Sequence, residues 1–182
     1  MDDLKSKTDS LDKGYVHVYT GNGKGKTTAA IGLAIRAAGA GFKVFIAQFM
    51  KNGEYSEIKA LKRFSDSIFI EQFGTGRFIG KTASRLDCEE SRRGLDKVRQ
   101  VLLSGKYQLV ILEEANMAVM CGLLTVNDLL DIISIKPDNL ELVLTGRYAA
   151  PRIVESADLV TEMKEVKHYF KNGVMARVGI EK

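Results

Sequence analysis

Residues 19–28 have the composition best suited to chemistry: alternating glycines, two lysines and two adjacent threonines, in the order Tyr-Thr-Gly-Asn-Gly-Lys-Gly-Lys-Thr-Thr. Glycines let a backbone approach a phosphate closely, and N–H groups at the start of a helix bind anions. Lys26 would reach the outer phosphates, and the Thr27 hydroxyl would bind Mg²⁺. We therefore expect a phosphate-binding loop made of consecutive residues: Gly21, Asn22, Gly23, Lys24, Gly25, Lys26, Thr27 and Thr28.

Such a loop must be held between a strand and a helix. Residues 15–19 are β-branched and aromatic, which favours a strand, and residues 29–38 are apolar and of helical type. This context distinguishes a nucleotide-binding P-loop from a glycine-rich turn without a ligand. One position departs from the usual pattern, because Thr20 stands where the first glycine is expected and Gly21 follows it.

A second acidic site is expected at the end of another strand. Residues 109–112 are continuously apolar and run into Glu113 and Glu114. A P-loop enzyme needs such a carboxylate for Mg²⁺. In a hydrolysing motor the first acid serves the metal and the second activates water, whereas in a group-transfer enzyme the second can serve the metal. The spacing leaves both alternatives open.

Two arginines and one loop are further candidates. Arg36 lies ten residues after Lys26. This spacing is near three helical turns, so both side chains lie on roughly one side of the helix. Arg36 is therefore either a nucleotide contact or a surface residue. Arg147 follows Gly146 after a predicted strand, where its guanidinium suits phosphate oxygens; a structural ion pair is the alternative. Residues 74–80 form either a lid over a second substrate or a plain connector.

Short apolar strands alternate with helices along the chain. We expect an α/β domain with a P-loop NTPase-like (RecA-like), mostly parallel sheet flanked by helices. In such a sheet ligands bind at the carboxyl ends of the strands. The expected strands are residues 15–19, 43–49, 68–72, 109–112, 141–145, 159–163 and 174–180, the last pairing through a turn at 171–173. The expected helices are residues 26–38, 55–64 and 85–104, one capped by Thr125 or Asn127 that reaches Ile135, and a short one from Pro151.

The 182 residues suit one domain, so we expect a mobile segment, residues 1–13, and a single nucleotide-binding domain, residues 14–182. A net charge of +4 suits an anionic ligand, but no basic run is interleaved with aromatic residues, so nucleic acid is not expected as a partner. Cys88 and Cys121 are expected to be free thiols, and no stretch has the character of a membrane span or signal peptide. These features predict a cytoplasmic protein.

The chain resembles the P-loop type of corrinoid adenosyltransferase over about residues 14–182. The resemblance lies in residues 19–30, in Gln48 and Phe49, in residues 74–76 and 145–147, in residues 166–168, and in Gly179 and Ile180. The long Thr-Gly-Asn-Gly-Lys-Gly-Lys-Thr-Thr form is much more specific than a generic P-loop.

This resemblance implies transfer of the 5′-deoxyadenosyl group of ATP to Co(I) of a reduced corrinoid, with release of triphosphate. It implies a triphosphate bound in reversed orientation on the loop, with Mg²⁺ on Thr27 and Glu114 and with Arg36 and Arg147 on the nucleotide. It also implies a homodimer and a reduced flavoprotein as electron donor. Because Co(I) is the nucleophile, the protein must position the reactants and stabilise the leaving triphosphate, with Lys26 and Arg147 as the catalytic groups.

Two positions depart from the family pattern. The usual Asp-Glu pair is Glu113 and Glu114, and the usual aromatic pair of the glycine loop is replaced by residues 77–79, in which Phe78 is the one aromatic. We expect Phe78 to contact the corrin or the lower face of cobalt. Two other functions compete: an ATPase or small-molecule kinase, which would release ADP, and a nucleotide-gated binding protein.

Overall fold

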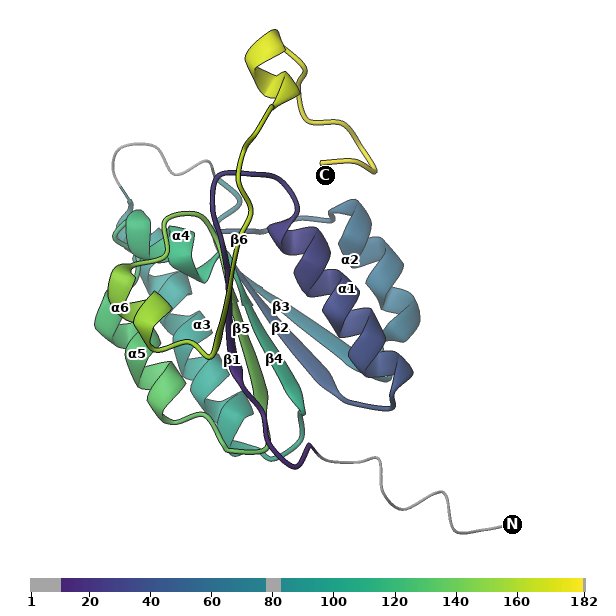
Figure 1. The fold of residues 1–182 in the computed structure, drawn as a ribbon, viewed down its shortest axis with the longest axis vertical. Coiled ribbons are helices and arrows are strands. Elements are labelled where there is room, and N and C mark those ends of the chain that lie inside the picture. Colours follow the sequence, from purple (N-terminus) through teal and green to yellow (C-terminus); the bar gives the residue numbers. More distant parts are fainter. Residues whose placement is uncertain (1–10, 78–82, 182) are drawn as a thin grey trace.

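The computed structural model describes residues 11–77 and 83–181, and within them six parallel strands form one sheet, in the order β3-β2-β4-β5-β1-β6 (Figure 1). The strands are β1 (Val16–Thr20), β2 (Val44–Phe49), β3 (Ile68–Phe73), β4 (Leu109–Glu113), β5 (Glu141–Thr145) and β6 (Leu159–Glu162). The helices are α1 (Lys26–Gly39), α2 (Ser56–Leu61), α3 (Arg85–Leu103), α4 (Ala115–Met120), α5 (Val126–Ser134) and α6 (Pro151–Glu155). Two 3₁₀ helices cover Lys62–Phe64 and Tyr169–Asn172.

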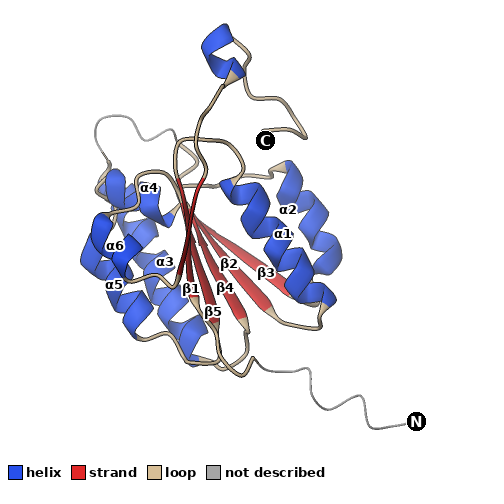
Figure 2. Ribbon diagram, in the orientation of Figure 1, coloured by secondary structure: helices blue, strands red, loops and turns tan. Residues whose placement is uncertain are grey.

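Helices cover both faces of the sheet, with α1 and α2 on one side and α3 to α6 on the other (Figure 2). Successive strand residues point to opposite faces. Phe45 and Leu112 therefore pack in the core under α3 to α6, whereas Ile46 and Ile111 pack in the core under α1 and α2. Burial on both faces explains why β2 and β4 are continuous apolar runs.

The prediction of an α/β fold with a parallel sheet is confirmed, and most predicted elements lie within one or two residues of the observed ones. The predicted strand at residues 174–180 and its turn at 171–173 are wrong. The 3₁₀ helix Tyr169–Asn172 and irregular backbone occupy this region. The segment is largely apolar, but Met175 and Val178 are strongly exposed, so no buried sheet face fixes them. The short helix α4, directly after β4, was not predicted.

Asp87 ties the loop after β3 to the start of α3. Its buried carboxylate accepts hydrogen bonds from the hydroxyls of Thr75 (2.6 Å) and Ser84 (2.7 Å), from the Ser84 N–H and from Arg77 Nη2 (2.8 Å). These hydrogen bonds hold the pKa of Asp87 well below its ordinary value, and those from the Thr75 and Ser84 hydroxyls have the largest effect. A depressed pKa means that the stabilisation is present above the unfolded-state pKa and is lost as the pH falls.

We therefore expect Asp87→Asn to lower the free energy of unfolding at pH 7 by about 2 kcal/mol, because charge-assisted hydrogen bonds to a buried carboxylate are lost. The difference from wild type should narrow as the pH falls below about 4, where the unfolded carboxyl takes up its proton. Urea unfolding of both proteins between pH 7 and pH 2.5 measures it. A constant difference over that range would contradict the assignment.

Candidate active site

The P-loop lies between β1 and α1 at the carboxyl edge of the sheet. Gly25 caps α1 in a left-handed conformation (φ 118°) that favours glycine. The ammonium group of Lys26 bends back over the loop and donates to the carbonyl oxygens of Gly21 and Gly23, each at 2.7 Å. Burial lowers the pKa of Lys26, and the charge of Glu114 opposes that shift. The loop thus holds a partly desolvated cation where outer phosphates are expected.

The two acids at the end of β4 have different surroundings. Glu113 is 1% exposed, and its carboxylate accepts a hydrogen bond from the Thr27 hydroxyl. Glu114 borders the pocket above the loop, and its N–H donates to Thr145 Oγ1 at 3.0 Å. Burial raises the pKa of Glu114, and the charge of Glu113 raises it further, while Lys51 and other cations oppose the shift. The pair therefore combines one enclosed carboxylate with one that faces the ligand space.

Three non-glycine residues of the described chain adopt left-handed backbone conformations, and all follow strands at this edge. They are Met50 (φ 62°), Glu114 (φ 61°) and Tyr148 (φ 58°), after β2, β4 and β5 respectively. Such conformations are costly and cluster at functional sites. Each is a charged residue that lines the pocket or is next to one in sequence: Glu114 lines it, Lys51 follows Met50, and Arg147 precedes Tyr148.

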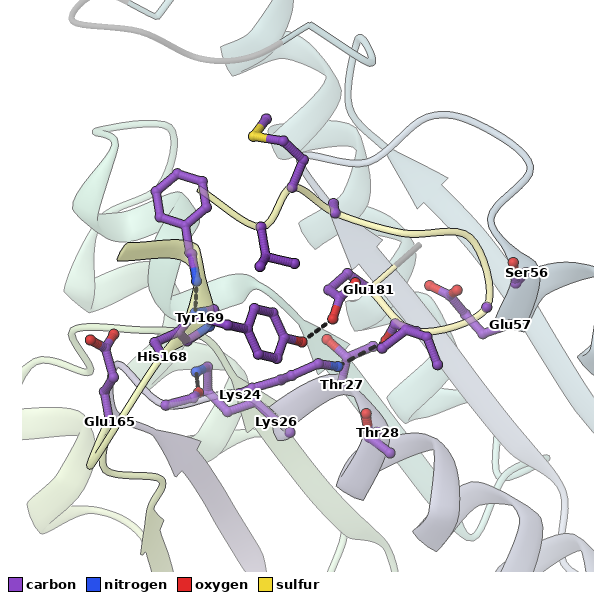
Figure 3. A pocket seen from close by; sticks show the side chains of 18 of the residues that line it. Lys24, Lys26, Thr27, Thr28, Ser56, Glu57, Glu165, His168, Tyr169 and Glu181 are labelled. Atoms are coloured by element: carbon purple, nitrogen blue, oxygen red, sulfur yellow. Dashed lines mark hydrogen bonds between the residues drawn. The ribbon is translucent and has the colours of Figure 1, made fainter. Parts of the chain in front are cut away.

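A pocket of about 900 Å³ opens above the P-loop. Its floor is the loop and the start of α1, and its sides carry Glu114 and Arg147 from strand ends and Glu57 from α2. Figure 3 shows that Lys24, Lys26, Thr27 and Thr28 come from one side and Tyr169 and Glu181 from the opposite side. Cationic and acidic side chains of separate strands thus converge on one volume.

The C-terminal segment, residues 163–181, contacts the loop and supplies the far wall of this pocket. The Gly23 N–H donates to the carbonyl of Met163 at 2.6 Å, and Lys24 Nζ donates to the carbonyl of Ile180 at 2.8 Å. Tyr169 and Arg177 both bond the carboxylate of Glu181. In Figure 1 the segment rises beyond the carboxyl edge and turns back toward the loop. Apart from the family resemblance of residues 166–168 and of Gly179 and Ile180, no sequence pattern predicted this wall.

The structure brings together most of the predicted site residues, namely residues 23–28, Glu114 and Arg147. Arg36 is exposed in the last turn of α1, about 15 Å along the axis from Lys26, and does not border the pocket, so its nucleotide contact stays a prediction. Phe78 lies outside the described residues, and its contact with a corrin also stays a prediction. Asn22 is exposed beside the pocket, and the carbonyl of Gly21 serves Lys26.

The two histidines have different places. The Nε2 of His17 lies 2.6 Å from Glu141 on the neighbouring strand β5, away from the pocket. His168 borders the pocket, and its Nδ1 accepts the Phe170 N–H at 3.1 Å. Lys51, which the sequence analysis missed, borders the pocket too and binds Glu113. The sequence feature that could have pointed to Lys51 is its position two residues after the buried strand β2.

Comparison with known proteins shows the family of this chain. The family model for ATP:corrinoid adenosyltransferase BtuR/CobO/CobP matches residues 12–181, nearly the whole chain. The chain belongs to this family. The corrinoid adenosyltransferase of Pseudomonas aeruginosa is 37% identical over 172 residues, covering 93% of this chain and 84% of that protein. Those of Sinorhizobium sp. and Escherichia coli strain K12 are 33% and 34% identical, covering 98% and 93% of this chain and 84% and 86% of theirs.

The adenosyltransferase pocket tolerates no side chain at Gly23. A Cβ there would lie 2.6 Å from the carbonyl oxygen of Met163 and 2.7 Å from that of Lys164. We expect Gly23→Ala to push the C-terminal segment off the loop and to weaken ATP binding by about tenfold or more, the equivalent of an overpacking cost of 1–3 kcal/mol. Calorimetric titration with ATP measures the change.

Gly32→Ala is the matched control, since a Cβ at Gly32 of α1 meets no atom within 4 Å. It should leave ATP affinity unchanged and stabilise the helix by about 0.5–1 kcal/mol. Equal ATP affinity in the two variants would show that contact between the loop and the C-terminal segment does not shape the nucleotide site.

Proposed function

We propose that this pocket binds ATP with Mg²⁺ and that the protein transfers the 5′-deoxyadenosyl group to the cobalt of a reduced corrinoid. Membership of the adenosyltransferase family and the names of relatives that match over most of their length support the reaction. The single structural observation that carries it is the convergence of Lys26, Arg147 and the glycine-rich loop on one pocket. This arrangement suits a highly charged leaving group.

The residues at the loop fit a magnesium ion. The Thr27 hydroxyl donates its hydrogen to Glu113, so the lone pairs of the Thr27 oxygen are free to bind a cation. Glu114 borders the same pocket as Thr27. Mg²⁺ prefers such oxygen ligands, usually one or two from protein, with phosphates and waters completing the shell. Within the described residues no cluster of three or more His, Cys, Asp or Glu side chains could bind a metal alone, so the triphosphate would supply further ligands.

In the proposed reaction Co(I), part of the substrate, attacks the ribose C5′ carbon. A cobalt–carbon bond forms, the C5′–oxygen bond breaks, and its electron pair leaves with the triphosphate. Lys26 and Arg147 would stabilise the negative charge that grows on that oxygen, and the bound Mg²⁺ would share this task. The protein's other task is to hold cobalt in line with the breaking bond.

Product analysis tests this function against its rivals. An adenosyltransferase releases inorganic triphosphate only when reduced corrinoid is present, whereas an ATPase or kinase releases ADP. A nucleotide-gated binding protein would bind ATP without a corrinoid-dependent product. Release of ADP as the main product would reject the proposal.

Several properties of the assembly belong to the same proposal. We expect a homodimer, a reduced flavoprotein as electron donor and a location in the cytoplasm, and sedimentation analysis would test the dimer. The domain division at residue 14 also stays a prediction. Among the described helices, none has the length and apolar character that crossing a bilayer requires. Cys88 and Cys121 are both free.

A further inference from the structure

Lys51 is a cation of the pocket for which the proposed reaction has so far supplied no role. It is the second residue after β2, and its Nζ lies 3.0 Å from Glu113 Oε2 and 3.2 Å from Glu113 Oε1. Its ammonium also lies 3.8 Å from Glu57 and 5.3 Å from the centre of the Tyr55 ring. Its side chain is 19% exposed, against 2% for Glu113, so the pair is largely shielded from water.

The backbone fixes the place of this lysine. Met50, just before it, is held at φ 62°. The loop after β3 packs tightly against the same backbone, because a Cβ at Gly74 would lie 2.6 Å from the Met50 carbonyl carbon and 2.7 Å from the Lys51 nitrogen. The costly conformation of Met50 and the close packing around it fix the direction of the backbone at Lys51.

Glu113 receives donors from three directions. Lys51 binds both of its oxygens, Gln48 Nε2 donates to Oε2 at 3.3 Å, and the Thr27 hydroxyl donates to Oε1. Gln48 is in turn held by Gln72 Nε2 at 3.0 Å. The position of Glu113 therefore decides the direction in which Thr27 points its hydroxyl hydrogen, and thus its free lone pairs.

We propose that Lys51 is a positioning residue of the MgATP site, acting through Glu113 to orient the Thr27 oxygen toward the metal. Without Lys51, Glu113 would lose the donor that binds both of its oxygens, so it would no longer hold the Thr27 hydroxyl in one direction. Partners that orient metal ligands typically change metal affinity by about 10–100-fold. The inference rests on the proposed function only in taking MgATP as the ligand.

The test measures ATP binding by calorimetry across a Mg²⁺ titration, without corrinoid. Lys51→Met should raise the Mg²⁺ concentration needed for half-maximal ATP binding by about tenfold. ATP affinity in EDTA should stay as in wild type, and Lys51→Arg should restore most of the Mg²⁺ response. Lys62→Met is the matched control: Lys62 lies on the adjoining 3₁₀ helix and pairs only on the surface with Glu54, so its response should match wild type. A weaker affinity of Lys51→Met in EDTA would instead assign Lys51 to direct phosphate contact and overturn the inference.

A double-mutant cycle decides whether Glu113 is the intermediary. In a Glu113→Gln background, Lys51→Met should cause no further loss of Mg²⁺ response. The same tenfold loss in both backgrounds would overturn the proposal. Lys51→Gln, which retains a donor without charge, replaces Lys51→Met if thermal unfolding shows that the latter does not fold. Because the assay contains no corrinoid, absence of adenosyl transfer would reject the proposed function and leave this inference standing.

Discussion

Lys26→Ala should reduce turnover by about 10²–10³-fold while the protein remains folded, because a single preorganised charge opposite a leaving group is worth that much in rate. The Lys26 ammonium is held by two loop carbonyls at 2.7 Å and borders the pocket with Arg147 and Glu114. Its removal takes away the cation nearest the loop backbone. Steady-state assay of product formation, with circular dichroism of the variant, measures both parts of the expectation.

Lys97→Ala provides the comparison for this variant. Lys97 lies on α3 and pairs at 2.7 Å with Glu71 on the surface, apart from the pocket. The Lys97→Ala variant loses one positive charge, as Lys26→Ala does, and should retain wild-type activity. If Lys26→Ala is as active as Lys97→Ala, the P-loop is not the active site.

Glu114→Gln should weaken Mg²⁺-dependent turnover more than Glu113→Gln does. Glu114 borders the pocket, whereas Glu113 is enclosed and bonded to Thr27 and Lys51. In the proposed assignment Glu114 binds Mg²⁺ directly, so its loss should exceed the cost of about 10–100-fold that is typical of a supporting residue. Turnover of both variants across a Mg²⁺ titration gives the comparison, and each amide keeps the size of the acid it replaces.

A larger defect in Glu113→Gln would reverse this assignment and make Glu113 the metal ligand. The thermal unfolding temperature separates that result from a folding defect, because Glu113 is buried and its loss leaves Lys51 without its carboxylate. Glu71→Gln, at an exposed pair on β3, is the matched control and should behave as wild type.

Local patterns predicted the central part of this fold. The P-loop, the buried strands and the cap at Thr125 each depend on neighbours in sequence, and α5 does begin after a Thr125 side chain that accepts the Asp128 N–H. The apolar composition of residues 174–180 misled the prediction, because composition does not show whether a partner strand exists. β6 ends the sheet with all four of its residues exposed, and the chain then leaves the sheet.

The sequence predicted the P-loop of the candidate site well, but it predicted less of the residues that line the sides of the pocket. Lys26, Thr27 and Arg147 follow from motif and strand ends, and the structure places them together. The different roles of Glu113 and Glu114 depend on the left-handed backbone conformation of Glu114. Two identical residues in sequence do not predict which of them adopts that conformation. Lys51 reaches Glu113 only because β2 and β4 are neighbours in the sheet, a pairing between strands that are distant in sequence.

The most direct test of the central claim is anaerobic incubation of the protein with ATP, Mg²⁺ and chemically reduced cobalamin, followed by spectroscopy of the corrinoid and analysis of the nucleotide products. We expect a cobalt–carbon bond to form and inorganic triphosphate to appear in equal amount, with neither product when ATP or the reduced corrinoid is omitted. Release of ADP and phosphate at the same rate with and without corrinoid, and with an unchanged corrinoid spectrum, would contradict the claim.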